Sequence, residues 1–408
     1  MPDPSILIGP FSEILTMEGL PDKGPIDDKR LNIVKNGGIV VNDGIIAEVG
    51  AFTALKKKDI EVHPIETVAV VMPGLIDSHT HICFGGSRAL DYSLRIAGKS
   101  YQDILREGGG IYATVDKTRN VSFDDLLRST ANRLSRHLSE GVTTCEIKSG
   151  YGLSLKEELK MLRVINKLKL ETPSTVIASC LAAHVPPKEI SDPQVYLNVI
   201  LEELLPVIRR EALSSRIDIF IEPEAFPPST AAPFLSIVTQ KGFDITVHAD
   251  QFTSGGSRLA VESNALSADH LESSTEEDIK MLAASDITAT VLPGASLGLG
   301  MNYAPARKLL DTGCRLAIAT DWNPGSAPMG DLLTQASLIS ASEKLTTGET
   351  FAAITVRAAK ALKLNDRGVL APGMKADFIS FPVSDHREIL YHQGKLKPDN
   401  IWIDGRKI

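Results

Sequence analysis

Short apolar runs alternate with long amphipathic stretches through the middle of the chain, from about residue 72 onward. The runs are rich in β-branched and aliphatic residues and predict eight strands, at 74–79, 141–147, 174–181, 216–221, 243–247, 265–269, 287–292 and 315–320. The stretches between them fit helices. One of these opens with the capping sequence Ser154-Leu155-Lys156-Glu157 and carries an apolar stripe at residues 155, 159, 162, 165 and 168. Alternating strands and helices form parallel sheets, so we predict an α/β protein with a (β/α)8 barrel.

The two ends of the chain follow a different pattern. Residues 37–49 place β-branched runs on either side of Asn42-Asp43-Gly44, where glycine tolerates the positive φ of a tight hairpin turn. Residues 377–381 and 400–408 predict further strands near the other end. We therefore predict two domains, a small discontinuous β-sandwich formed by residues 1–71 and 367–408, and a barrel formed by residues 72–366.

Composition and charge exclude several classes of protein. Hydrophobic residues make up 43% and charged residues 23%, as in soluble globular proteins. The chain has 43 Lys and Arg against 51 Asp and Glu, a net charge of -8, so we expect no nucleic-acid partner. There is no signal-peptide pattern and no apolar run of about 18 residues, so we expect a cytoplasmic protein without a membrane partner. The four cysteines are far apart, which fits reduced thiols.

The strongest local signal is a strand that ends in two histidines, His79 and His81. Side chains at i and i+2 of a strand face the same way, so both imidazoles can bind one metal ion. Such a pair by itself is more often made of surface or packed residues. However, five of the nine histidines follow the ends of predicted strands, where barrels build active sites: His79, His81, His184, His248 and His270. We expect the others, His63, His137, His386 and His392, to be surface or half-buried residues.

Asp321 follows the last predicted strand and brings a carboxylate to the same edge, although alone it would more often be a turn or helix-cap residue. Three imidazoles and one carboxylate leave room for a water, as in catalytic metal sites. A metal ion lowers the pKa of such a water from about 15.7 toward about 7, so hydrolysis is the expected reaction. We expect His270 to position the water or carry a proton, and Asp269 to face away and be structural.

These residues, with the stretch from Pro73 to His81, resemble the amidohydrolase superfamily. Within it, the chain resembles the imidazolonepropionase family of histidine degradation at stretches spread over nearly its whole length, at 84–88, 107–111, 148–153, 248–251, 267–271, 320–326, 371–377 and 385–388. The resemblance implies a TIM barrel with one Zn²⁺ or Fe³⁺ ion per chain, in a homodimer. It also implies hydrolysis of the cyclic amide of a small anionic substrate, 4-imidazolone-5-propanoate, to N-formimidoyl-L-glutamate.

The same resemblance assigns roles to individual residues. The implied metal ligands are His79, His81, His248 and Asp321. The implied substrate or product contacts are Arg88, Tyr101, Tyr151, His184, Asn323, Gly325 and Ser326. A guanidinium such as that of Arg88 can bind a propionate through two parallel hydrogen bonds, although a salt bridge to Asp91 or Asp77 is the alternative.

Gln251 departs from those members of the family that carry a glutamate three residues after the histidine of the fifth strand, a residue proposed to relay the proton. A primary amide does not titrate, so Gln251 can orient water or substrate but cannot accept a proton. The catalytic set is therefore expected to be Asp321, His270 and Gln251, with the proton carried by Asp321 or His270.

Two other functions stay open at this point. A deaminase of purine or pyrimidine rings would use the same ligands but would release ammonia. A catalytically inactive homologue that serves as a scaffold would be expected to have a broken ligand set, whereas the set in this sequence is intact.

Overall fold

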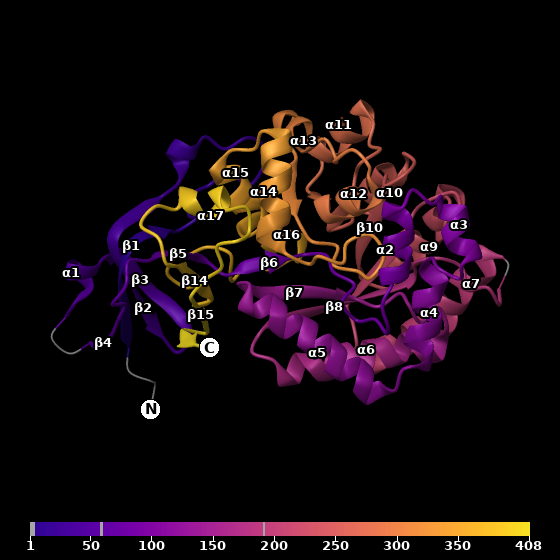
Figure 1. Ribbon diagram of the computed structural model, residues 1–408, viewed down its shortest axis with the longest axis horizontal. Coiled ribbons are helices and arrows are strands. Elements are labelled where there is room, and N and C mark those ends of the chain that lie inside the picture. The colour runs from indigo at the N-terminus through magenta and orange to yellow at the C-terminus, as the bar shows by residue number, and fades with distance from the viewer. Residues whose placement is uncertain (1–4, 58–59, 191) are drawn as a thin grey trace.

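The computed structural model describes residues 5–57, 60–190 and 192–408, without the side chains of Tyr101, Gln102 and Leu105. It consists of a barrel and a separate sheet that lies at the left of Figure 1. The indigo amino-terminal strands and the yellow carboxyl-terminal strands lie together in that sheet (Figure 1). The predicted (β/α)8 barrel is confirmed, and so is an additional β structure built from both chain ends, although its eight strands are hydrogen-bonded into one sheet where a sandwich was predicted.

The barrel contains eight parallel strands, and each of the eight predicted strands is present. Their order in the sheet is β13-β12-β11-β10-β9-β8-β7-β6. In chain order they are β6 (Leu75–Asp77), β7 (Val142–Lys148), β8 (Thr175–Ala183), β9 (Arg216–Phe220), β10 (Asp244–Ala249), β11 (Ser267–His270), β12 (Thr288–Val291) and β13 (Arg315–Ile318).

The first and last strands of the barrel meet just beyond their carboxyl ends. The backbone N–H of Asp321 donates to the carbonyl of His79 at 3.0 Å, and that of His81 donates to the carbonyl of Trp322 at 3.0 Å. Buried Asp77 reinforces this seam, since its carboxylate accepts hydrogen bonds from the backbone N–H and the hydroxyl of Thr320. The closure therefore brings residues from the two ends of the barrel sequence to one point.

The longer helices lie outside the barrel (Figure 1). In α6 (Leu155–Glu171) the Ser154 side chain accepts from the N–H of Glu157, as predicted. The Glu157 carboxylate pairs with Lys160 instead of completing the capping box. The predicted apolar stripe packs inward, with Leu159, Leu162, Ile165 and Leu168 buried.

The remaining helices connect the strands. They are α1 (Phe52–Leu55), α2 (Ala89–Ile96), α3 (Tyr101–Arg106), α4 (Ile111–Asn120), α5 (Phe123–Ser139), α7 (Pro193–Val199), α8 (Leu205–Arg210), α9 (Pro228–Gln240), α10 (Gly256–Glu262), α11 (Glu276–Ala284), α12 (Pro293–Leu299), α13 (Ala306–Thr312), α14 (Leu332–Glu343), α15 (Thr347–Ala353), α16 (Val356–Ala361) and α17 (Arg387–Tyr391). Among the described residues, none of the helices combines the length and the apolar character needed to cross a bilayer.

The terminal sheet joins strands from both ends of the chain in the order β16-β15-β14-β5-β1-β2-β3, with β4 paired to β1. The strands are β1 (Ile6–Leu15), β2 (Ile33–Asn42), β3 (Ile45–Ala51), β4 (Glu61–Pro64), β5 (Val70–Pro73), β14 (Phe378–Phe381), β15 (Asn400–Ile403) and β16 (Arg406–Lys407). The predicted hairpin is formed by β2 and β3, and both Asp43 and Gly44 in its turn have positive φ. Trp402 stacks on Phe378, with ring centroids 4.8 Å apart, and meets the edge of Phe11 in the sheet's core.

Candidate active site

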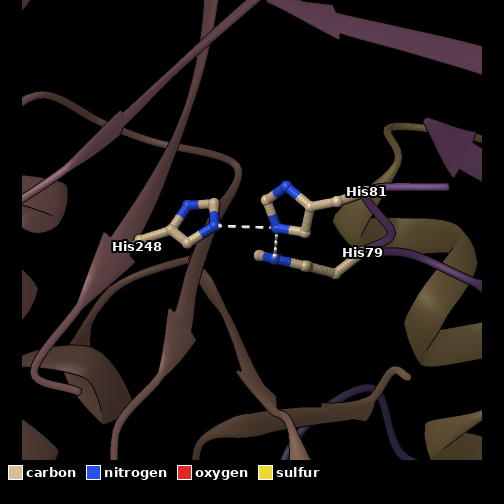
Figure 2. A group of neighbouring side chains, drawn as sticks. All are labelled: His79, His81 and His248. Atoms are coloured by element: carbon tan, nitrogen blue, oxygen red, sulfur yellow. Dashed lines mark hydrogen bonds between the residues drawn. The ribbon is translucent and has the colours of Figure 1, made fainter. Parts of the chain in front are cut away.

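Three of the predicted metal ligands lie together at the carboxyl end of the barrel. The Nε2 atom of His81 is 3.2 Å from Nε2 of His79 and 3.3 Å from Nε2 of His248 (Figure 2). All three rings are buried. Figure 2 shows the three rings turned toward one another, so the strand ends at β6 and β10 deliver one imidazole cluster.

The outer nitrogens of two of these rings face carboxylates. Nδ1 of His79 lies 2.7 Å from Oδ2 of Asp269, and Nδ1 of His248 lies 3.1 Å from Oδ1 of Asp218. A carboxylate accepts a hydrogen bond, so each Nδ1 carries the proton and each Nε2 keeps a lone pair. Lone pairs that face the same small space repel unless a cation lies between them. The three histidines therefore fit a bound metal ion.

Asp321 supplies a carboxylate beside the cluster. Its Oδ1 atom lies 3.2 Å from Nε2 of His81 and 3.7 Å from Nε2 of His79. The side-chain amide of Asn323 donates to the other oxygen, Oδ2, at 2.8 Å, which leaves Oδ1 directed to the imidazoles. The structure thus places the four residues that the sequence marks as ligands around one position.

Asp269 does not face away from the site, so that prediction was wrong. It contacts His79 through its carboxylate, and His270, the next residue, lines the cavity as well. The reason lies in the backbone: His270 has φ +90° and Leu271 has φ +73°, so the side-chain alternation of a strand ends at His270. Strand alternation therefore put Asp269 on the wrong side of β11.

His137 is a second correction, because it is fully buried and not a surface or half-buried residue. Its Nε2 atom lies 2.7 Å from Oδ2 of Asp77, the carboxylate that also binds Thr320 at the barrel seam. The apolar pattern of α5 gave no sign of this contact, because the partner is far away in the sequence.

A cavity of about 400 Å³ opens beside the histidine cluster. Most of the residues that the sequence assigned to substrate or catalysis line it: Arg88, Tyr151, His184, Gln251, His270, Asn323, Gly325 and Ser326. The side chain of Tyr101 lies outside the described part of the structure. The structure therefore gathers these residues, Tyr101 excepted, around one space next to the imidazoles.

Arg88 fits both interpretations of its role. Its Nε atom donates to Oδ2 of Asp91 at 2.7 Å, the predicted salt bridge, and the side chain still lines the cavity. A Cβ atom at Gly325 would come within 2.5 Å of the Arg88 Nη1 atom. A side chain at 325 would therefore displace the guanidinium from this loop, where the contact with Asp91 now holds it.

Sequence reasoning missed several residues of the cavity wall, namely Arg95, Lys99, Phe220 and Phe252. Arg95 on α2 also donates to the carbonyl of Gly298 at 2.7 Å. A partial signal was present for Arg95, which follows Arg88 by seven residues, a helical spacing, and lies on α2. Lys99 lies past the end of α2, so helical spacing does not account for its place in the wall. The wall of the cavity is therefore more cationic than Arg88 alone implies.

Burial sets the protonation of the histidine cluster. Burial and the nearby Lys148 ammonium lower the pKa of His81 to about 3. Burial also lowers the pKa of His248 to about 4, although Asp218 opposes this shift. Neutral imidazoles are the form that binds metal ions. The cluster is therefore ready to act as a ligand set at neutral pH.

His270 and Asp321 are shifted the other way. Burial lowers the pKa of His270, but the carboxylates of Glu272, 3.7 Å from Nδ1, and of Asp321 and Asp269 together outweigh it, and the pKa is raised above its ordinary value. Burial raises the pKa of Asp321, against the pull of the neighbouring histidines. A raised pKa lets each of these two groups keep a proton to higher pH, which suits a proton carrier. Burial raises the pKa of the neighbouring Asp269 as well, to about 7.

The chain is similar to known proteins over nearly its whole length. Residues 70–408 match the model of the amidohydrolase family. An imidazolonepropionase of Bdellovibrio bacteriovorus is 37% identical, in an alignment that covers 99% of this chain and 96% of the relative. An imidazolonepropionase of Deinococcus deserti is 39% identical, with 93% of this chain and 94% of the relative covered.

Solved structures share the fold at lower identity. A zinc-bound adenosine deaminase of Xanthomonas campestris matches with a TM-score of 0.69 and 17% identity, over 98% of this chain and 92% of its own. An atrazine chlorohydrolase of Arthrobacter aurescens complexed with zinc matches with a TM-score of 0.70 and 16% identity, over 98% of this chain and 94% of that protein. At this identity the two structures support the fold alone.

Proposed function

Since this chain belongs to the amidohydrolase family and, within it, to the imidazolonepropionases, we propose that it hydrolyses the cyclic amide of 4-imidazolone-5-propanoate to N-formimidoyl-L-glutamate in histidine degradation. The observation that carries the proposal is the cluster of His79, His81, His248 and Asp321 beside a cavity that contains Arg88. The enzyme is a hydrolase, and its substrate is a small anion.

One Zn²⁺ or Fe³⁺ ion would be held by the three histidines and Asp321. When bound, such an ion supplies Lewis acidity, which makes water nucleophilic near neutral pH and polarises a carbonyl group. The facing Nε2 lone pairs and the carboxylates behind them support this assignment.

The wall of the cavity suits an anionic ring. Arg88 would bind the propionate through its terminal nitrogens, since its Nε is used by Asp91. Arg95 and Lys99 add positive charge to the same wall, and a volume of about 400 Å³ suits a small ligand. Tyr151, His184 and the loop of Asn323, Gly325 and Ser326 would hold the ring and the product. Tyr101 stays a proposed contact of the same kind.

The proton moves through residues of the barrel edge. Asp321 takes a proton from the attacking water as the oxygen bonds to the amide carbon. It returns the proton to the ring nitrogen as the C–N bond breaks. His270, with its raised pKa, donates to the oxyanion that develops on the carbonyl oxygen. Gln251 orients the water or the ring but carries no proton.

Incubation of the purified protein with 4-imidazolone-5-propanoate tests this function. We expect loss of the imidazolone absorbance, a product one water heavier than the substrate, and no ammonia. Metal analysis should give about one ion per chain, and the His248→Ala variant should lose most of both metal and activity. Release of ammonia from purine or pyrimidine rings, with no turnover of the imidazolone, would instead identify a deaminase.

Three further expectations accompany this function. We propose that the enzyme is a homodimer in the cytoplasm, and that residues 1–71 with 367–408 form one domain and residues 72–366 the other. Light scattering on the purified protein measures the oligomer, and a monomer at micromolar concentration would contradict it. Limited proteolysis locates the domain boundaries.

A further inference from the structure

A buried lysine lies between the carboxylates that hold the histidine cluster. Lys148, at the end of β7, has no exposed side-chain surface. Its Nζ atom donates to Oδ2 of Asp218 at 2.7 Å and forms ion pairs with Oε2 of Glu146 at 2.7 Å and Oδ2 of Asp269 at 3.9 Å. Lys148 is absent from the residues that line the cavity. Lys148 therefore contacts the carboxylates and does not line the space for the substrate.

Two of these three carboxylates are the partners of metal-ligating histidines. Asp218 uses Oδ2 for Lys148 and Oδ1 for Nδ1 of His248. Asp269 uses the same oxygen, Oδ2, for Nδ1 of His79 and for the longer contact with Lys148. One ammonium group thus connects the supports of two ligands that come from different strands.

The charges around Lys148 show why it is needed. Three buried carboxylates surround it. Among the residues that the structure describes, the other Lys or Arg side chain paired with any of them is Arg216, whose Nη1 lies 3.9 Å from Glu146. Arg216 also donates to the carbonyl of Leu362, away from Asp218 and Asp269. Without Lys148, Asp218 and Asp269 would be buried charges without a cation, which is costly and favours their reorientation.

We propose that Lys148 is a positioning residue: it fixes Asp218 and Asp269, and through them holds Nε2 of His248 and His79 toward the metal ion. This inference rests on the metal site of the proposed function. Lys148 touches neither the ion nor the substrate. Its removal therefore acts on the geometry and affinity of the metal site.

The Lys148→Met variant tests the inference, because methionine keeps an unbranched side chain only one atom shorter and removes the charge. We expect the affinities for Zn²⁺ and Co²⁺, measured by competition with a chelator, to fall by about 10- to 100-fold, as for other residues that support metal ligands. We also expect the visible spectrum of the Co²⁺-loaded protein to change, because that spectrum reports the coordination geometry.

The control variant is Arg357→Met. Arg357 is another fully buried cation, and it donates to the carbonyls of Pro21 and Gly24, far from the site in its contacts. Its loss should lower the free energy of unfolding and leave metal affinity and the Co²⁺ spectrum unchanged. The comparison separates a general loss of stability from a change at the metal site.

A double-mutant cycle keeps the test decisive. If Lys148 acts through Asp218, then Lys148→Met and Asp218→Asn should be non-additive in metal affinity. Should Lys148→Met fail to fold, the double variant Lys148→Met with Glu146→Gln takes its place in the cycle. The second substitution removes the charge of one of the carboxylates that Lys148→Met leaves unpaired. Metal affinity within twofold of wild type with an unchanged spectrum, or additive effects in the cycle, would overturn the role of Lys148. Wild-type protein that binds neither metal would overturn the proposed function as well.

Discussion

At the carboxyl end of the barrel, charged side chains are buried side by side, whereas the terminal sheet buries aromatic rings. Lys148, Glu146, Asp218 and Asp269 are at most 1% exposed, and Asp218 and Asp269 contact two rings of the histidine cluster. In the terminal sheet, the buried core is apolar, with the rings of Phe11, Phe378 and Trp402 packed among aliphatic side chains. Buried charges add little net stability, whereas buried aromatic area adds much. Changes in the first region should therefore affect chemistry, with a loss of stability where they leave a buried charge unpaired, and changes in the second should affect stability alone.

The largest effect is expected at Asp321. In Asp321→Asn the amide keeps the shape and one carbonyl oxygen, so part of the metal should stay bound while kcat falls by about 10² to 10⁴. Gln251→Glu is the matched comparison and should leave kcat within about tenfold. Measurement of kcat/KM against pH, with metal content, checks both variants. A metal-loaded Asp321→Asn enzyme with wild-type turnover, or a Gln251→Ala enzyme that loses as much, would assign the proton to another residue.

The opposite pattern is expected in the terminal sheet. Trp402 is 3% exposed, and Trp402→Ala should lower the free energy of unfolding by about 3 to 5 kcal/mol, through lost burial and a new cavity. The kcat/KM of the folded variant should stay at the wild-type value. Denaturant unfolding measures the loss, with Tyr391→Ala, at a ring that is 79% exposed, as a control expected within about 0.5 kcal/mol. Lost activity at full stability would contradict the separation of the two regions.

Arg88 sharpens the comparison, since it has a salt bridge as well as a place in the cavity wall. Arg88→Ala should lose about 1.5 to 3 kcal/mol of transition-state binding. The loss should appear as a lower kcat/KM, chiefly because KM rises. Arg88→Lys should recover part of this, because lysine keeps the charge but not the planar fork. Steady-state kinetics check both variants. The control is Arg106→Ala, which removes an arginine from an exposed ion pair with Asp103. Wild-type KM and kcat in both Arg88 variants would show that Arg88 has only a structural role, in the salt bridge with Asp91.

The smallest effect is expected at Glu349. This carboxylate accepts a hydrogen bond from the backbone N–H of Ile26 in the amino-terminal segment, at a place remote from the site. Burial raises the pKa of Glu349, but hydrogen bonds from Arg307 and from backbone N–H groups outweigh it and lower the pKa below its ordinary value. A lowered pKa stabilises the fold above the unfolded-state pKa of about 4.3, and this stability is lost as the pH falls toward the folded value.

We therefore expect Glu349→Gln to be less stable than wild type by about 1 kcal/mol at pH 7, with a difference that shrinks below about pH 4. Unfolding curves of both proteins across this range measure the difference, and its independence of pH would contradict the role of the charge. Activity at pH 7 should be unchanged.

The sequence was sufficient for the strands and for the gathering of His79, His81 and His248, because both leave local signals. Apolar runs of strand length alternate with amphipathic stretches, and the histidines follow the ends of these runs. The contacts of Asp269 and His137 left no such signal. The first depends on the positive φ of His270 at the end of β11, and the second on Asp77, a partner from another element. Side-chain direction at a strand end and long-range pairing both require the folded backbone. The role of Tyr101 stays a prediction.

The order of strands in the terminal sheet has a consequence for synthesis on the ribosome. β5 pairs with β1 on one side and with β14 on the other, but β14 follows β5 by roughly 300 residues. At about 5 to 20 residues per second, the nascent chain carries β5 with one open edge for on the order of 15 to 60 s. That edge presents Val70, Val71 and Met72, and an open apolar edge can pair with another chain. The barrel strands are thus all synthesised before the terminal sheet can be completed.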